Sequence, residues 1–228
     1  MRRWLLLIAV IALIALGWSQ RRRLPDRYNP WAPLDLRAPP DLFLGYKLQR
    51  LDADAPRCLA ALQQSGATFS IVRDYVGAGG CGWNHAVRLQ DTGVARLERP
   101  TIVTCPLAAS LVLFDRHALQ PLARQWFGQP VVSISHVGSY ACRTIYSQPD
   151  AALSRHARAE AIDVTGFRLG NGRAVVIAKD WDKGLDGTFL HKLEARGCPF
   201  FGIVLGPEYN AAHHTHFHLE AGSWGWCR

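Results

Sequence analysis

Two short stretches of the sequence concentrate residues that could bind a metal ion. Residues 154–163 read SRHARAEAID, and residues 213–220, some fifty positions later, read HHTHFHLE. Imidazole nitrogens and carboxylate oxygens are common ligands of zinc and of related divalent cations. What these stretches can do depends on whether they meet in the fold or are ordinary polar segments that happen to be rich in histidine.

The spacing of His156 and Asp163 limits how the two residues could act together. On a continuous helix they would stand about 10 Å apart along the axis, and on a continuous strand they would point to opposite faces. A loop at His156 that leads into a strand over residues 161–165 avoids both problems. Asp163 then points to the polar face of the strand, and the loop can bring His156 back beside it.

The second stretch is predicted to be a strand over residues 215–222. Alternate side chains of a strand share a face, so the histidines at 214, 216 and 218 would lie on one side with Glu220. One imidazole from this face, with His156 and Asp163, would make a set of three ligands. Three protein ligands leave one coordination position of zinc open, as catalysis requires, whereas structural sites are more often closed by four.

The elements that position these residues begin near residue 50, as a mixture of helices and strands. Strands and helices do not alternate strictly, which favours an α+β domain around a mostly antiparallel sheet over a doubly wound parallel sheet. Helices are expected over residues 54–64, 106–127 with a bend at Pro121, and 189–196. Strands are expected over residues 68–76, 131–138, 161–169, 173–181, 199–206 and 215–222.

The formal net charge of +8 is concentrated at the N-terminus. Residues 1–50 hold nine Lys/Arg against three Asp/Glu, whereas the rest of the chain holds seventeen against fifteen. No basic run interleaved with aromatic residues follows residue 50. The charge therefore argues for a membrane surface as partner and against a nucleic-acid groove.

The N-terminal segment has the composition of a signal anchor. Residues 4–18 are an unbroken apolar stretch between two arginine clusters, so we expect residues 1–23 to be an uncleaved anchor in the inner membrane. A cleaved signal peptide is the alternative. Residues 24–42 contain five prolines and are expected to be an extended tether, whose apolar residues could also lie along the domain surface. The domain itself is expected over residues 43–228.

The six cysteines indicate an oxidising compartment. They are scattered, with no pair at the two-residue spacing of zinc ribbons, which is typical of structural disulfides. Six cysteines allow about 15 pairings. The one pairing that we predict is Cys198 with Cys227, which would tie the C-terminus to the core.

The two motifs resemble those of a known group of zinc peptidases. SRHARAEAID is similar to the S-x-H-x-x-G-x-A-x-D signature of D-alanyl-D-alanine carboxypeptidases and dipeptidases, lysostaphin-type endopeptidases and the hedgehog signalling domain. HFH resembles the H-x-H of the subset represented by penicillin-insensitive murein endopeptidase. From residue 43 onward the chain most closely resembles the bacterial extensin-like C-terminal domain family, which is related to those peptidases. One departure is Ala159, where the signature has glycine.

This resemblance implies a fold of the hedgehog and D-Ala-D-Ala-peptidase type and a role for individual residues. His156, Asp163 and His218 are implied as ligands of Zn²⁺, His216 as the general base and His213 as a further catalytic-site residue. Zinc lowers the pKa of a bound water molecule towards neutrality and polarises a carbonyl group. A neighbouring imidazole accepts the proton of that water and passes it to the leaving amine.

Two roles stay open at the level of sequence. The Glu-x-x-His motif that supplies a glutamate base in the carboxypeptidase branch is absent, so Glu220 and Glu208 are alternatives to His216. Arg143, in the loop before the first motif, is the expected partner of negative charge that develops on the substrate carbonyl oxygen. Alternatives to Arg143 in the same part of the chain are His136 and Tyr140. A substrate groove could include Trp224 and Trp226.

The expected activity is that of a zinc metallopeptidase acting on the peptide crosslinks of cell-wall peptidoglycan. It would work as a monomer in the periplasm, anchored to the inner membrane, with no nucleic-acid partner. The alternative is a non-catalytic, metal-containing module that binds the cell wall or a protein.

Overall fold

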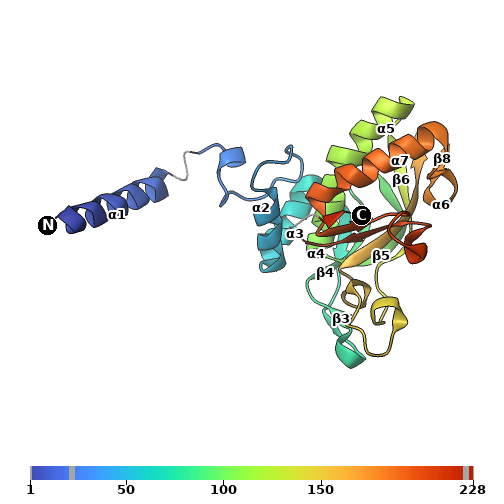
Figure 1. Cartoon of the computed structure of the whole chain (residues 1–228), viewed down its shortest axis with the longest axis horizontal. Coiled ribbons are helices and arrows are strands. Elements are labelled where there is room, and N and C mark those ends of the chain that lie inside the picture. Colours follow the sequence, from blue (N-terminus) through green and yellow to red (C-terminus); the bar gives the residue numbers. More distant parts are fainter. Residues whose placement is uncertain (1, 21–23, 223–225, 228) are drawn as a thin grey trace.

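The computed structural model describes residues 2–20, 24–222 and 226–227 (Figure 1). They form a mixed α+β fold in which helices pack around one large sheet. In the described part of the chain this sheet has nine strands. They are β1 (Thr68–Ile71), β4 (Ala86–Asp91), β5 (Arg96–Thr104), β6 (Val131–Gly138), β7 (Ala161–Leu169), β8 (Ala174–Val176), β9 (Ile203–Leu205), β10 (Phe217–Glu220) and β11 (Trp226–Cys227).

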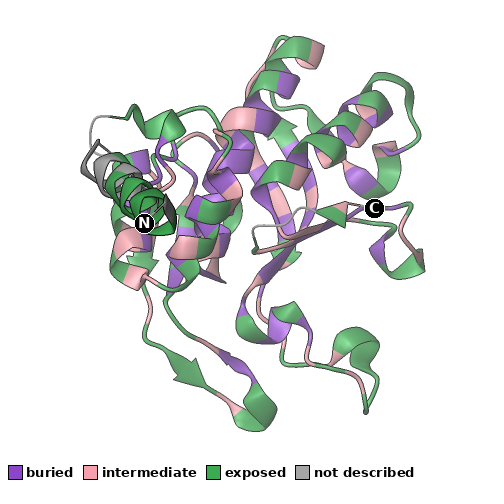
Figure 2. Ribbon diagram, turned by 60° about the vertical axis from the view of Figure 1, so that its left-hand side comes forward, coloured by how far each residue is buried: buried purple, intermediate pink, exposed green. Residues whose placement is uncertain are grey.

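The strand order is β1-β4-β5-β6-β7-β10-β9-β11, and β8 also pairs with β7. Neighbouring strands are antiparallel except for β5 with β6 and β9 with β11, which are parallel. The predicted α+β class with a mostly antiparallel sheet is therefore confirmed. A separate small hairpin, β2 (Tyr75–Val76) with β3 (Gly82–Trp83), projects from the body and is mostly exposed (Figure 2).

The helices form the other part of the core. They are α2 (Leu44–Asp52), α3 (Ala55–Ser65), α4 (Cys105–Phe114), α5 (Gln120–Phe127), α6 (Ile177–Asp180) and α7 (Gly184–Gly197). All but one of the ten residues of α4 are buried, and α2 and α3 pack against it (Figure 2). A helix that is apolar on every side needs such cover, so α4 lies at the centre of the helical layer.

The predicted helix over residues 106–127 is present with an interruption. The π-helical segment η4 (Asp115–Leu119) separates α4 from α5, and Gly128 ends α5 in a left-handed conformation with φ +64°. Pro121 has no N–H to donate to the preceding turn, and a local π-turn is one way in which a helix accommodates such a loss. The irregularity of this helix is thus a wider turn that ends two residues before Pro121.

Four predicted strands are shorter than expected. Residues 199–206 form a strand only over β9, and residues 215–222 only over β10. Residues 173–181 form a strand only over β8, and α6 begins directly after it. The Asp180 carboxylate accepts a hydrogen bond from the Val176 N–H at 2.8 Å, which fixes the start of this short helix. Residues 68–76 are divided between β1 and the exposed strand β2.

Part of the proline-rich segment over residues 24–42 is packed against the core. Leu34 and Leu36 belong to the main cluster of buried apolar side chains, and Ala32 is buried as well. The ring of His117 also donates from Nε2 to the Leu36 carbonyl oxygen at 3.2 Å. This segment therefore contributes to the stability of the fold.

Leu36→Ala is expected to destabilise the protein by about 2–5 kcal/mol, because it opens a cavity where a fully enclosed leucine stood. Leu36 is 1% exposed, whereas Leu42, in the same segment, is 90% exposed and provides the matched control. Chemical denaturation measures both variants. Equal effects of Leu36→Ala and Leu42→Ala would show that the segment does not pack in this way.

Three disulfides cross-link the described cysteines. Cys58–Cys105 joins α3 to the start of α4, Cys81–Cys142 joins the β2–β3 hairpin to the loop after β6, and Cys198–Cys227 joins the end of α7 to β11. The predicted pairing of Cys198 with Cys227 is confirmed.

The predicted anchor, residues 1–23, includes the helix α1 (Arg2–Gln20). Among the described residues, no helix is both long enough and apolar enough to cross a membrane.

Candidate metal centre

Neighbouring elements of the fold bring the two histidine-containing stretches together. Asp163 lies on β7 and His218 directly opposite it on β10 in the antiparallel register. The short 3-10 helix η6 (Arg155–Arg158) precedes β7 and carries His156, as expected for a loop that leads into the strand. All three residues meet at the side of the sheet opposite the buried Ile162 and Val164.

One atom from each residue forms a compact triangle. Nε2 of His156 is 3.2 Å from Oδ1 of Asp163, and Nδ1 of His218 is 2.9 Å from the same oxygen. The two ring nitrogens are 3.1 Å apart. Ligands of a tetrahedral zinc ion with bonds of about 2.0–2.1 Å are separated by roughly 3.3 Å, so the triangle has nearly the dimensions of one face of that polyhedron.

The hydrogen bonds of the remaining ring nitrogens fix how the two imidazoles face this triangle. Nδ1 of His156 donates to the carbonyl oxygen of Ser139 at 2.6 Å, because a carbonyl can only accept. Nε2 of His218 donates to Oε1 of Glu220 at 2.9 Å. In each neutral ring the other nitrogen then carries a lone pair, and both lone pairs are aimed at the Asp163 oxygen and at each other. Two lone pairs and an anion this close together repel one another unless a cation or a proton lies between them.

The local electrostatics favour positive charge at the same place. Burial raises the pKa of the Asp163 carboxyl, but hydrogen bonds with His156 and His218 outweigh it and hold this pKa well below its ordinary value. Burial lowers the pKa of His218, but its hydrogen bonds to Asp163 and Glu220 raise it to about 9. Without a metal, a proton on His218 therefore supplies the positive charge.

The backbone around His156 is shaped by its neighbours. The Ser154 hydroxyl accepts from the His156 N–H at the start of η6, and Ala159 ends it with φ +55°. Residues with a side chain seldom adopt this left-handed conformation, which glycine adopts freely. Ala159 meets this requirement with a side chain of only one carbon.

His216 lies beside the triangle. Its Nε2 is 3.5 Å from Oδ1 of Asp163, and its side chain is 13% exposed. Burial lowers its pKa, and the charges of His218 and His156 lower it further against the opposing effect of Asp163. A neutral imidazole at this position is able to accept a proton.

His213 is the second imidazole beside the triangle. Its ring centroid is 5.6 Å from that of His218 and 5.4 Å from that of His216. Nδ1 of His213 contacts Oδ1 of Asn210 at 2.8 Å, and an amide oxygen accepts, so the nitrogen donates. Burial and then the charges of His218 and His216 lower its pKa to about 4.

The prediction that His214 shares a face with the other histidines is wrong. The strand begins only at Phe217, and a 3-10 turn, η8 (Ala211–His213), with further turn residues precedes it. His214 is exposed, and its Nδ1 contacts the Pro207 carbonyl oxygen at 3.0 Å. His213 is brought to the site in its place, because the turn replaces the alternation of a strand.

The triangle opens onto a cavity of about 450 Å³. Arg143 lines this cavity, and its charge helps to lower the pKa of His216. Tyr146 and Trp226 line it as well, whereas Trp224 lies outside the described residues. The cavity thus combines the three converging ligand atoms with a cation and aromatic side chains.

Three residues considered as alternatives are elsewhere. His136 is buried, and its Nε2 donates to the Arg99 carbonyl oxygen at 2.8 Å. Tyr140 packs edge-on against Trp83, away from this cavity. Glu208 is exposed and 3.8 Å from His191.

Both carboxylate oxygens of Glu220 face other side chains, so Glu220 does not stand free as a general base would. One of its oxygens accepts from His218, and the other lies 3.8 Å from Nε of Arg155. Arg155 in turn pairs with Glu160 at 2.6 Å. A carboxylate that accepts from the distal nitrogen of a metal-binding histidine orients the ring and makes it a better ligand.

Some supporting groups had no strong signal in the sequence. The Ser139 carbonyl oxygen is a backbone group, which every residue type has, so the sequence could not indicate its role. Asn210 caps η8 by accepting from the Ala212 N–H, and the spacing of an Asn three residues before a histidine is the one local pattern that could have indicated its contact with His213.

Glu220→Gln is expected to weaken zinc binding by about 10–100-fold, because an amide is a poorer acceptor for the His218 N–H than a carboxylate. Competition with a chelating dye measures the affinity. Glu208→Gln, an exposed change of the same kind, is the control and is expected to have no effect. If both variants bind zinc like the parent protein, Glu220 does not support His218.

Comparison with known families places the chain beside one of them. The model of a family described as extensin-like protein C-terminus matches residues 56–228, which include every residue of the triangle. No curated protein and no solved structure gives a significant match.

Proposed function

The chain belongs to the extensin-like protein C-terminus family, and from this membership and the geometry of the triangle we propose that it is a zinc-dependent hydrolase. Its proposed substrates are the peptide crosslinks of cell-wall peptidoglycan, as in the zinc peptidases whose motifs it resembles. The observation that carries the proposal is the convergence of His156 Nε2, Asp163 Oδ1 and His218 Nδ1 within 3.2 Å of one another.

The donor set suits zinc. Two imidazole nitrogens and one carboxylate oxygen form a ligand set of the kind found in catalytic zinc sites, which keep a position open. A bound zinc ion would supply a Lewis acid that acidifies water and polarises a carbonyl group. His156 and His218 are held in the required orientation by Ser139 and Glu220, so little reorganisation is needed to accept the ion.

The remaining side chains of the site supply proton transfer and substrate binding. His216 is neutral at neutral pH and lies next to the triangle, where it is placed to accept a proton from water and pass it to a leaving amine. Arg143 carries a permanent charge on the cavity wall and would stabilise negative charge on the scissile carbonyl oxygen. A cavity of about 450 Å³ is large enough for a short peptide segment.

The test is direct digestion. The purified protein is loaded with zinc and incubated with intact peptidoglycan, and the released muropeptides are separated and identified by mass. New peptide fragments that disappear when zinc is removed by a chelator and return when it is restored support the proposal. Unchanged muropeptides together with retained binding to the wall would contradict it, and would favour a non-catalytic metal-containing binding module.

We further propose that the domain works in an oxidising compartment, which for a cell-wall substrate is the periplasm. The support comes from three disulfides that pair all six cysteines, because such bonds persist outside reducing compartments. Anchoring by residues 1–23 stays a prediction from the sequence.

A further inference from the structure

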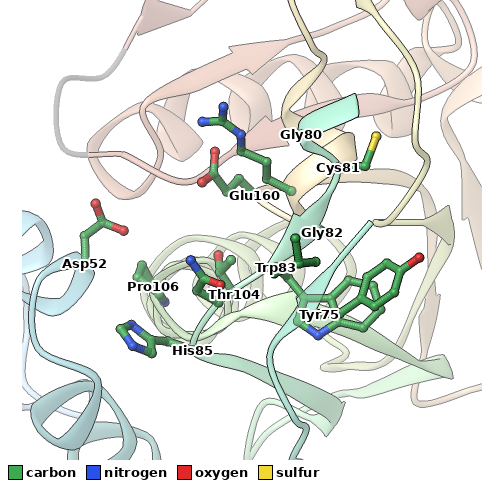
Figure 3. A pocket seen from close by; sticks show the side chains of 13 residues that line it. Asp52, Tyr75, Gly80, Cys81, Gly82, Trp83, His85, Thr104, Pro106 and Glu160 are labelled. Atoms are coloured by element: carbon green, nitrogen blue, oxygen red, sulfur yellow. The ribbon is translucent and has the colours of Figure 1, made fainter. Parts of the chain in front are cut away.

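A second cavity, of about 390 Å³, lies beside the β2–β3 hairpin (Figure 3). The end of α2, the hairpin and the start of α4 surround it, together with Arg158 at the end of η6 and Glu160 just before β7. In the described part of the chain it shares no lining residue with the metal cavity. It is therefore a separate place where a ligand of moderate size could bind.

One side of this second cavity is aromatic. The rings of Tyr75 and Trp83 lie with centroids 4.9 Å apart, and Tyr140 contacts Trp83 edge-on at 4.8 Å. The Trp83 indole N–H donates to the Arg73 carbonyl oxygen at 3.0 Å, which holds the ring in place. The Cys81–Cys142 disulfide fixes the hairpin to the loop after β6 that carries Tyr140. The aromatic wall is thus held in position from several sides.

The rest of the lining mixes charged and polar side chains with Val76, Pro106 and glycines, and its net charge is small. Asp52 and Glu160 offer carboxylate acceptors, and Arg158 offers guanidinium donors (Figure 3 shows the two acids on the side of the cavity away from the aromatic rings). Glu160 is already paired with Arg155 at 2.6 Å. With two acids and two arginines in and beside the cavity, neither an anion nor a cation is favoured as the ligand.

Thr104 adds a polar group that lacks a partner. The residue lines the cavity, is 8% exposed, and its hydroxyl has no hydrogen-bond partner among the described residues (Figure 3). Its backbone N–H is satisfied by the Ala159 carbonyl oxygen at 2.9 Å. A buried hydroxyl without a partner costs free energy, which a ligand hydroxyl brought against this part of the cavity wall would offset.

We propose that this second cavity binds a saccharide. A sugar ring presents C–H groups on its faces, which pack against aromatic rings, and hydroxyl groups at its edge, each of which both donates and accepts. An aromatic wall opposite a near-neutral mixture of acceptors and donors matches both features. The proposal concerns binding alone and does not depend on the metal centre or on its proposed activity.

The experiment is a calorimetric titration of the full-length protein, in which the heat of binding is measured for tetramers of N-acetylglucosamine and of glucose. Saturable binding of either sugar with a Kd below about 1 mM is expected. Tyr75→Ala is expected to weaken binding about tenfold, because it removes one of the aromatic rings against which the sugar would pack. Tyr28→Ala is the matched control, because Tyr28 is 51% exposed where Tyr75 is 44% exposed, and it is expected to bind like the parent protein.

Thr104→Val is a second variant, which should make the protein more stable and its saccharide binding weaker. Removal of a buried, unpartnered hydroxyl is expected to raise the melting temperature, while loss of one hydrogen bond weakens saccharide binding by about three- to tenfold. Asp163→Ala is expected to leave saccharide binding unchanged.

The proposal is overturned if the folded protein binds neither tetramer at concentrations up to about 10 mM, well above the expected Kd. It is also overturned if binding is unaffected by both Tyr75→Ala and Thr104→Val, or is reduced equally by Tyr28→Ala. Loss of saccharide binding in Asp163→Ala would place the sugar in the metal cavity and would contradict the proposed site. None of these outcomes depends on whether the protein hydrolyses peptidoglycan.

Discussion

Asp163→Ala is expected to remove zinc binding from the purified protein. The Oδ1 atom of Asp163 is the common neighbour of both imidazole nitrogens, at 3.2 and 2.9 Å, and it is the only anionic group among the three ligand atoms. Its loss leaves two neutral imidazoles facing each other with no negative charge to favour a cation. The affinity should therefore fall by more than the roughly 10–100-fold that loss of a supporting residue costs.

Elemental analysis after dialysis against a weak chelator measures this result, with about one zinc expected per parent chain and almost none per variant chain. Asp182→Ala, an exposed aspartate outside the cavity, is the control and should retain its zinc. Circular dichroism checks that Asp163→Ala is folded. A folded Asp163→Ala protein that retains full zinc would show that the ion is bound elsewhere and would remove the basis of the hydrolase proposal.

The elements best predicted from sequence are those whose ends are marked by local signals. β6 and β7 begin and end at the predicted residues, because alternating or continuous apolar runs are bounded there by turn residues. For α3, Asp54 caps the start, and Gly66, at φ +85°, ends the helix. The region after β8 was not predictable in this way, since an apolar run such as residues 174–178 fits a strand and a short helix equally well.

The candidate site was predictable where the spacing of residues along the sequence excluded other local conformations. The seven-residue step from His156 to Asp163 ruled out a continuous helix and a continuous strand, and the structure has the loop and strand that remained. The pairing of His218 with Asp163 could not be derived from spacing, because it depends on the register of two strands 55 residues apart. The same holds for the Ser139 carbonyl oxygen, which comes from a loop after β6.

Turn geometry accounts for the exchange of His214 and His213. An alternating pattern places every second residue on one face only while the backbone stays extended. Residues 211–215 are in turns instead, so the alternation holds for Glu220 and His218 on β10 and fails before them. Which histidine lies beside the ligand triangle is therefore decided by the turn that Asn210 caps.

His216→Ala is expected to lower turnover by about 10²–10⁴-fold while zinc content stays the same, because the side chain adjoins the ligand triangle without belonging to it. The measurement is the rate of crosslink cleavage at saturating substrate together with the zinc content of the same sample. His214→Ala is a matched control two residues away: it removes an exposed imidazole bonded only to the backbone among the described residues, and should leave the rate unchanged.

The two readouts separate the roles that an imidazole at this position can have. A base that takes a proton from water is needed for kcat and not for binding the ion, so the rate falls and zinc remains. A fourth ligand would close the coordination position that catalysis needs, and its loss would reduce zinc content as well. Loss of zinc in His216→Ala would therefore reassign His216 as a ligand and leave His213, whose pKa of about 4 also keeps it neutral, as the remaining imidazole able to accept the proton.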